Sequence, residues 1–114
     1  MLLKELCALV NGTVVRGESR MDESVEYGFA SDLMSDVLTV RNDNFIIITG
    51  LANIQSLRTA EMSDVNCVLF VRGKNITDEM LELAEENDMV ILRTDYSMFK
   101  ASGILYEAGL KPVY

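Results

Sequence analysis

The residues of this chain that could bind a small ligand follow short apolar runs, where predicted strands end. Residues 25–37 give the clearest case, because a hydrophobic alternation reaches Gly28 and is followed by two Ser-Asp pairs, Ser31-Asp32 and Ser35-Asp36. A strand that leads directly into a helix places such small polar groups at one end of a sheet. That sheet end is the usual location of ligand contacts in an α/β domain.

Three further loops, residues 49–53, 72–75 and 93–95, carry polar or basic residues after apolar runs, with the sequences T-G-L-A-N, R-G-K-N and R-T-D. The carboxyl ends of parallel strands share one sheet edge, where helix N-termini offer unpaired N–H groups and partial positive charge. We therefore expect a small anionic or nucleotide-like ligand at this edge. The predicted ligand-binding residues are Gly28, Ser31, Asp32, Thr49, Gly50, Asn53, Arg72 and Thr94.

A purely structural interpretation of the same loops stays open. In it, Gly50 and Gly73 only make turns, Asn53 caps a helix, and the two arginines at 72 and 93 pair with nearby acids. Such loop chemistry occurs in many α/β domains that have no ligand.

The composition argues against several classes of catalytic site. The chain has no His, which removes the commonest general base, the Ser-His and Cys-His nucleophile pairs and the commonest zinc ligand. It has no Cys-x-x-Cys pair and no G-x-x-x-x-G-K-[ST] loop. We therefore expect no catalysis, no metal and no cofactor. The alternative is a small phosphoryl-transfer or hydrolytic enzyme with a metal on Asp32 or Asp36, although acids at helix starts are more typical of caps and dipole partners.

The charge balance limits the partners. With 18 acidic and 10 basic side chains the net charge is −8, which repels nucleic acids and anionic membrane surfaces. Six of the acids fall within residues 78–88, without a Lys or Arg among them. This segment is either a solvated helix face or a docking surface for a basic partner.

Cysteine usage and hydropathy predict a cytoplasmic protein. Cys7 and Cys67 lie far apart among apolar residues, which is typical of reduced core thiols. Lys4 and Glu5 follow Met1 closely, unlike a signal peptide. No apolar run, residues 45–48 included, is long enough to cross a bilayer.

Helical and strand patterns alternate along the chain. Helices are predicted at residues 2–10, from Ser31 or Asp32 as N-cap to about residue 38, and at 53–62, 77–87 and 97–108; strands are predicted at 13–16, 25–30, 45–49, 68–71 and 89–92. The last three strands lack polar alternation, as expected when both faces are covered. Repeated β-α units imply right-handed crossovers. The fold class is therefore α/β: a single domain with a mainly parallel β-sheet flanked by helices, in three layers (α/β/α).

Gly103 lies inside the last predicted helix, where a glycine costs about 1 kcal/mol relative to alanine unless close packing needs it. The stripe Met98, Ala101, Ser102 and Leu105 is also small in its middle. Packing against the domain's own sheet explains both features, and so does a close subunit contact. The second explanation predicts a homodimer.

Two segments resemble the DRTGG domain family, a small α/β module, and the likeness extends over most of the chain. Gly28 with residues 31–37 is similar to the family's G-x-x-S-D-L-x-S-D-V stretch, and residues 92–99 resemble its closing L-x-T-x-x-S-x-F pattern. Residues 75–84 look like the helix start between them. The D-R-T-G-G string itself is absent, since Asp22-Glu23-Ser24 precedes Val25.

The resemblance implies a regulatory role. DRTGG domains are similar to the amino-terminal domain of HPr kinase/phosphorylase, whose catalytic domain is separate. They occur inside phosphotransacetylase-like proteins and in pyrophosphatases regulated by cystathionine β-synthase repeats, where they look regulatory and help to pair subunits. For this chain the resemblance implies a single DRTGG-like domain, residues 1–114, that senses a ligand, forms a homodimer and acts with a separate effector protein.

Overall fold

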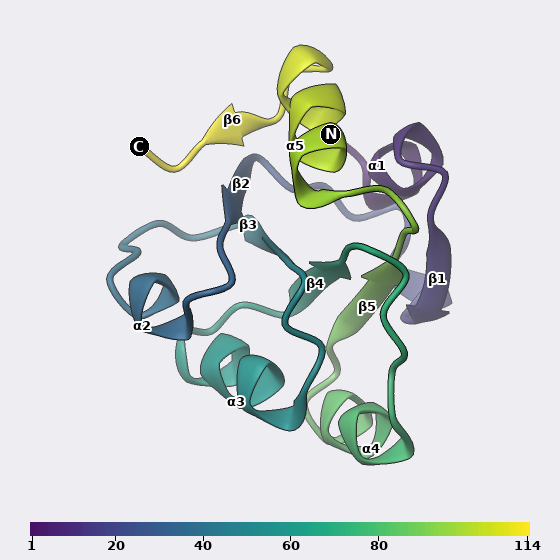
Figure 1. The fold of residues 1–114 in the computed structure, drawn as a ribbon, viewed down its shortest axis with the longest axis vertical. Coiled ribbons are helices and arrows are strands. Elements are labelled where there is room, and N and C mark those ends of the chain that lie inside the picture. Colours follow the sequence, from purple (N-terminus) through teal and green to yellow (C-terminus); the bar gives the residue numbers. More distant parts are fainter.

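Six strands form one sheet in a computed structural model that describes residues 1–114 (Figure 1). They are β1 (Thr13–Arg16), β2 (Tyr27–Ala30), β3 (Phe45–Thr49), β4 (Cys67–Phe70), β5 (Val90–Arg93) and β6 (Lys111–Pro112). Their order across the sheet is β1-β5-β4-β3-β2-β6. All neighbours pair in parallel except β1, which is antiparallel to β5. The predicted mainly parallel sheet is confirmed.

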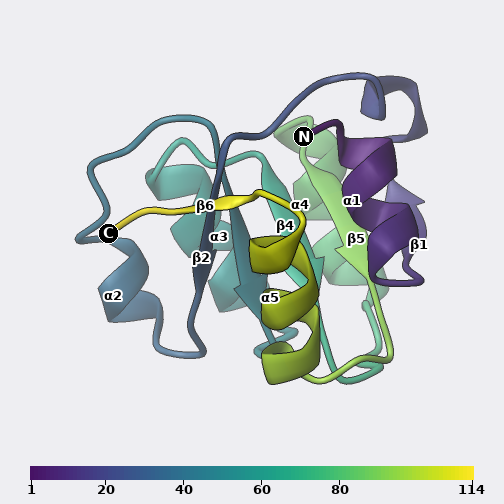
Figure 2. The ribbon, with the colours of Figure 1, turned by 90° about the horizontal axis from the view of Figure 1, so that it is seen from above.

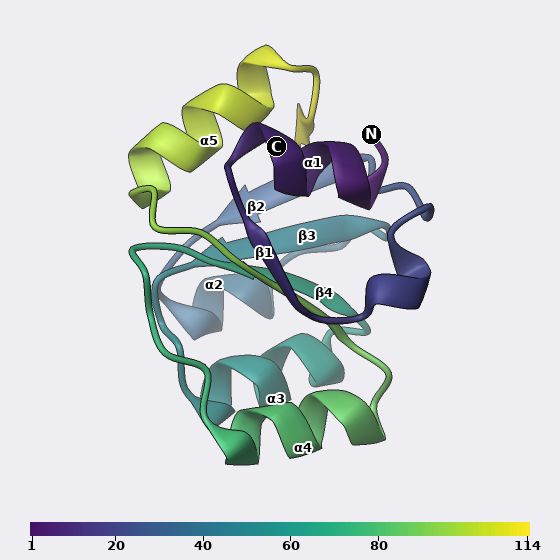
Figure 3. The ribbon, with the colours of Figure 1, turned by 90° about the vertical axis from the view of Figure 1, so that its right-hand side faces the viewer.

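Helices cover both faces of this sheet (Figure 3). They are α1 (Leu3–Leu9), the short 3-10 helix η1 (Glu18–Arg20), α2 (Met34–Val37), α3 (Ile54–Met62), α4 (Asp78–Glu86) and α5 (Met98–Glu107). Helices α1 and α5 pack on one face, whereas α2, α3 and α4 pack on the other. The three-layer α/β/α prediction is therefore confirmed. None of these helices has the length and hydrophobicity that a membrane-spanning segment needs.

Local side-chain caps explain where the three longer helices begin. The side chains of Asn53, Thr77 and Ser97 each accept a hydrogen bond from the backbone N–H three residues later, at 2.9, 3.2 and 3.1 Å. Each bond satisfies a donor that the first helical turn leaves free. The predicted N-cap at Thr77 is confirmed. Gly109, with φ of +110°, follows the last helix as predicted.

The second helix departs from its prediction. Helix α2 begins at Met34 with Leu33 as its N-cap, so neither Ser31 nor Asp32 caps it. The Ser31 hydroxyl instead accepts from the Leu33 N–H at 3.0 Å, which closes a local turn before the helix. Such side-chain turns compete with helix capping for the same kind of residue.

Strand β6 was not among the predicted strands. This two-residue strand pairs with the first half of β2, and it contains the only proline, Pro112. An edge strand tolerates proline because the missing N–H would face away from the sheet. Beyond β6 the chain passes to the α2 side, where the Asn42 side chain donates to the Val113 carbonyl at 3.2 Å (Figure 2).

The sheet divides the core into two clusters. All five residues of β3 are buried, with Ile46 and Ile48 facing α1 and α5, and Phe45 and Ile47 facing α2 to α4. Each such side chain contributes roughly 1.5–3 kcal/mol by leaving water. Both faces of the central strands are thus covered, as the unbroken apolar runs predicted.

Both cysteines are free and buried in the cluster beneath α1 and α5. Burial among apolar side chains raises the pKa of the Cys67 thiol from 9.0 to about 12, because the thiolate cannot be solvated there. Burial also raises the pKa of Cys7.

The raised pKa of Cys67 predicts an alkaline loss of stability. Above pH 9 the unfolded chain ionises this thiol while the folded chain keeps it neutral, so the free energy of unfolding falls as pH rises toward 12. The slope for one such thiol is about 1.4 kcal/mol per pH unit. Cys67→Ala should start from a lower stability at pH 7 and then fall less steeply, as measured by urea denaturation at pH 7, 9 and 10. Parallel pH profiles for the two proteins would contradict this prediction.

Candidate functional site

Four of the predicted site residues meet at the carboxyl ends of β2, β3 and β4. The Asp32 carboxylate accepts from the Gly50 N–H at 2.7 Å and the Thr49 hydroxyl at 3.0 Å through one oxygen. Its other oxygen lies 3.1 Å from Nη2 of Arg72. We call these four residues the Asp32 cluster. The prediction that these loops lie together at one sheet edge is correct, and the central position is held by the chain's own carboxylate.

The local sequence explains this geometry. Thr49 is the last, fully buried residue of β3, and its hydroxyl also accepts from the Leu51 N–H at 3.1 Å, which turns the chain at Gly50. Gly50 has no side chain, so the Arg72 guanidinium can lie directly over it. A Cβ at position 50 would stand 2.1 Å from Nη2 of Arg72.

Backbone hydrogen bonds to the loop after β5 hold the loop that carries Arg72. Arg72 and Gly73 have φ of +65° and +63°, and their N–H groups donate to the carbonyls of Tyr96 and Thr94 at 2.8 and 3.0 Å. The loop after β4 is therefore bonded to the loop after β5. This fixes the backbone from which the Arg72 side chain reaches Asp32.

The ion pair of the Asp32 cluster is open to solvent. The Asp32 and Arg72 side chains are 47% and 49% exposed. Such a pair contributes about 0–1 kcal/mol, because water screens both charges. A solute can therefore reach the charged groups.

Thr94 and Asn53 lie at the same edge with their side chains already engaged. The Thr94 hydroxyl is buried, donates to the Val10 carbonyl at 2.6 Å and accepts from the Tyr96 N–H at 3.1 Å. The Asn53 side chain caps α3. Arg93 donates to the carbonyls of Lys74 and Gly73, as a structural arginine does.

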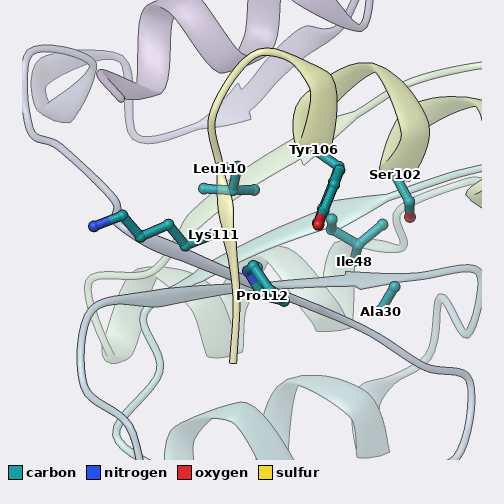
Figure 4. Close-up of a pocket in the computed structure, with 8 residues that line it drawn as sticks. Ala30, Ile48, Ser102, Tyr106, Leu110, Lys111 and Pro112 are labelled. Carbon is teal, nitrogen blue, oxygen red and sulfur yellow. The ribbon is translucent and has the colours of Figure 1, made fainter. Parts of the chain in front are cut away.

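Gly28 does not join the Asp32 cluster. It lines a half-open pocket of about 100 Å³ between α5 and the edge formed by β2 and β6 (Figure 4). A Cβ on Gly28 would stand 2.7 Å from Cδ2 of Leu110, so close packing explains this glycine. The lining residues are Gly28, Ala30, Ile48, Ser102, Tyr106, Leu110, Lys111 and Pro112.

Sequence reasoning missed this pocket as a site. Ser102 and Tyr106 reach from α5 toward Ile48 in Figure 4, and the Ser102 hydroxyl oxygen is buried without a hydrogen-bond partner. Small residues on α5 were the available signal, but they did not show that a cavity forms beside β6.

The six acids of residues 78–88 are all exposed. Asp88 pairs with Arg16 and Arg20, whereas the other five acids, all on α4, are exposed to solvent. No cluster of three or more His, Cys, Asp or Glu side chains could hold a metal ion.

Comparisons with known proteins place the fold. The model of the DRTGG domain family matches residues 5–108. No curated protein sequence matches the chain. Three chains among solved structures match it.

One of the three is a crystal structure of the CBS and DRTGG domains of the regulatory region of Clostridium perfringens pyrophosphatase, complexed with its activator, diadenosine tetraphosphate. It superposes with a TM-score of 0.75 and 16% identity over 98% of this chain. The present chain spans 48% of that one, about half its length. At this identity the likeness shows the fold.

The hydrogen bonds of Thr94 predict a structural role. Thr94→Val keeps the side-chain shape but leaves the Val10 carbonyl and the Tyr96 N–H without a partner, so it should lower the free energy of unfolding by about 1–3 kcal/mol. The exposed Thr39 hydroxyl donates to the Asp36 carbonyl, and Thr39→Val should change stability by less than about 0.5 kcal/mol. Urea denaturation compares the two variants, and equal losses would refute the buried role of Thr94.

Proposed function

The chain belongs to the DRTGG domain family, and we propose that it is a noncatalytic regulatory domain that senses a small ligand and acts with a separate effector protein. The match of the family model to residues 5–108 carries this proposal. The structurally similar DRTGG domain lies in the regulatory region of a pyrophosphatase that was solved with a nucleotide activator. A ligand-sensing role fits both observations.

The proposal also covers the extent of the domain, its location in the cell and its partners. Residues 1–114 act as one domain, similar to the amino-terminal domain of HPr kinase/phosphorylase in standing apart from a catalytic domain. The protein works in the cytoplasm, where Cys7 and Cys67 stay reduced. Its charge of −8 disfavours nucleic acids and anionic membranes as partners.

The proposed ligand is a small anion or nucleotide bound at the sheet edge around the Asp32 cluster. Support comes from the convergence of the Gly50 N–H, the Thr49 hydroxyl and the Arg72 guanidinium on one point. Backbone amides and arginine are the usual partners of phosphate groups. Ser31, Asn53 and Thr94 flank this point, and Gly28 belongs to the pocket beside β6.

The alternative of a phosphoryl-transfer or hydrolytic enzyme has less support. It needs a metal held at Asp32 or Asp36, and neither residue belongs to a group of three or more His, Cys, Asp or Glu side chains that could hold one. The Asp32 carboxylate already accepts from three donors, and one of them carries a positive charge that disfavours a cation at the same place.

A ligand screen tests the regulatory proposal. We expect at least one member of a panel of nucleotides and small anions to raise the melting temperature of the wild type, in proportion to the logarithm of its concentration, and to remain unhydrolysed. Gly50→Val should abolish that shift while unfolding stays cooperative, because the new side chain would displace Arg72 and cover the amide. Glu82→Gln on exposed α4 is the control and should bind normally. If Gly50→Val bound the ligand as tightly as the wild type, the ligand site would lie away from the Asp32 cluster.

The exposed side of α5, next to the pocket that Tyr106 lines, supports the proposed homodimer. Phe99 and Tyr106 are 90% and 67% exposed, and nothing lies within 4 Å of a Cβ added to Gly103. Packing against the domain's own sheet therefore does not explain Gly103. Residues 99, 103 and 106 share one helix face by their spacing.

This face is complementary to itself. A two-fold axis beside Gly103 would place two antiparallel copies of α5 in contact, with Phe99 of one copy beside Tyr106 of the other. The same axis brings Lys100 close to Glu107 of the second copy, which pairs opposite charges.

The dimer proposal predicts a mass near twice 12.7 kDa in light scattering at micromolar concentration. Phe99→Asp should give the monomer mass, because a carboxylate replaces an aromatic ring at the centre of the contact. Met62→Asp, at an exposed apolar residue of α3, is the matched control and should remain dimeric. A wild-type protein that is monomeric at all concentrations would contradict the dimer proposal. A Phe99→Asp variant that remains dimeric would show that the interface does not involve this face of α5.

A further inference from the structure

Three donors, two at the end of β3 and one on the loop after β4, converge on the two oxygens of one carboxylate. The Gly50 N–H and Thr49 hydroxyl share one oxygen of Asp32, at 2.7 and 3.0 Å, and Arg72 approaches the other at 3.1 Å. A backbone amide, a hydroxyl and a guanidinium are the groups that proteins use to bind oxyanions. The chain has thus built an oxyanion site and filled it with its own side chain.

The surroundings of this site are more basic than the rest of the protein. Lys74 follows Arg72 on the same loop and forms no salt bridge. Arg93 of the next loop donates to the Lys74 and Gly73 carbonyls and lies 3.8 Å from Asp95, an acid of that edge. Without the Asp32 carboxylate, these loops would leave a local positive charge on a chain whose net charge is −8.

Asp32 can leave the site without unfolding its loop. Its side chain is 47% exposed, so rotation toward solvent is open to it. Residues 31–33 join the four-residue strand β2 to the four-residue helix α2, and their turn is closed by the Ser31 hydroxyl, not by the Asp32 carboxylate. Only the three contacts of the carboxylate would be exchanged.

We propose that Asp32 is an internal competitor that occupies the site in the free protein, and that a phosphate group binds by replacing its carboxylate. This proposal rests on the ligand site proposed above and assigns its ligand class. A phosphate group carries up to two negative charges and three oxygens, so it can engage the same donors and makes stronger charge-assisted bonds to arginine than a single carboxylate does. Any ligand of this site must pay for the displacement of Asp32, which lowers its apparent affinity.

Inorganic phosphate is the probe of this proposal, and Asp32→Ala and Asp32→Asn are the main variants. Alanine empties the site. Asparagine keeps an oxygen that can accept from the Gly50 N–H and the Thr49 hydroxyl but no longer pairs with Arg72. The readout is the dissociation constant from calorimetry, together with the amide resonance of Gly50 in a titration followed by NMR, which localises the binding.

Phosphate should bind Asp32→Ala at least tenfold more tightly than the wild type, with Asp32→Asn between them, and should shift the Gly50 amide. Adding Arg72→Gln to Asp32→Ala should reverse the gain. Asp22→Ala is the matched control, because Asp22 pairs with Lys4 at 2.9 Å on the surface and its loss changes the net charge equally. This control should bind phosphate like the wild type.

Three results would overturn the proposal: no gain in either Asp32 variant, an equal gain in Asp22→Ala, or a Gly50 amide that does not respond. If Asp32→Ala fails to fold, the comparison of Asp32→Asn with the wild type decides. Acetate is the second probe, and binding as tight as that of phosphate would overturn the assignment to a phosphate group.

The experiments distinguish a failure of the Asp32 displacement from a failure of the proposed regulatory function. If a nucleotide from the screen binds the wild type and Asp32→Ala equally, the sensing function stands and the displacement of Asp32 is wrong. If phosphate binds Asp32→Ala as expected while no member of the panel binds the wild type, the site stands and the sensing function fails.

Discussion

The structure depends on covering both faces of its central strands. β3, β4 and β5 are almost wholly apolar and buried, so each needs a strand on either side for its backbone hydrogen bonds and a helix layer above and below. Parallel pairing satisfies the backbone, and the helices between strands satisfy the faces. Because every crossover then starts at the same sheet edge, the loops after β2, β3, β4 and β5 are brought together whatever their function.

Because these loops lie close together, most of their polar side chains form hydrogen bonds to nearby backbone groups. Most side-chain donors at this edge already donate to backbone carbonyls of neighbouring segments. Thr94 donates to the Val10 carbonyl, and Arg93 donates to the carbonyls of Lys74 and Gly73. Arg72 differs because its guanidinium points to a carboxylate that is half-exposed to water. The buried bond of Thr94 to the Val10 carbonyl stabilises the fold, whereas an exposed ion pair contributes little and can be exchanged.

Elements with a strong local signal were predictable from the sequence. β1 and β3 have the predicted bounds, and Thr77 and Ser97 cap the helices that they begin, since unbroken apolar runs and short polar caps act within a few residues. The grouping of Asp32, Thr49, Gly50 and Arg72 followed from topology. Side-chain directions did not, because the inward turn of Thr94 and the reach of Asp32 to Gly50 depend on contacts 84 and 18 residues apart. Strand β6 could not be predicted, because two residues are too few to show a hydrophobic alternation.

The two surfaces for which we propose functions are joined by a backbone hydrogen bond. The Arg72 N–H donates to the Tyr96 carbonyl at 2.8 Å, and Tyr96 immediately precedes Ser97, the N-cap of α5. The Tyr96 ring also lies 3.9 Å below the ammonium of Lys100, in the first turn of that helix. A shift of the Arg72 backbone must therefore either stretch this bond or move the residue that leads into α5. In the displacement that we propose, a phosphate group would take the place of the Asp32 carboxylate against Arg72, on the same short segment that leads into α5. The proposed ligand site and the proposed subunit contact would then be connected through one loop.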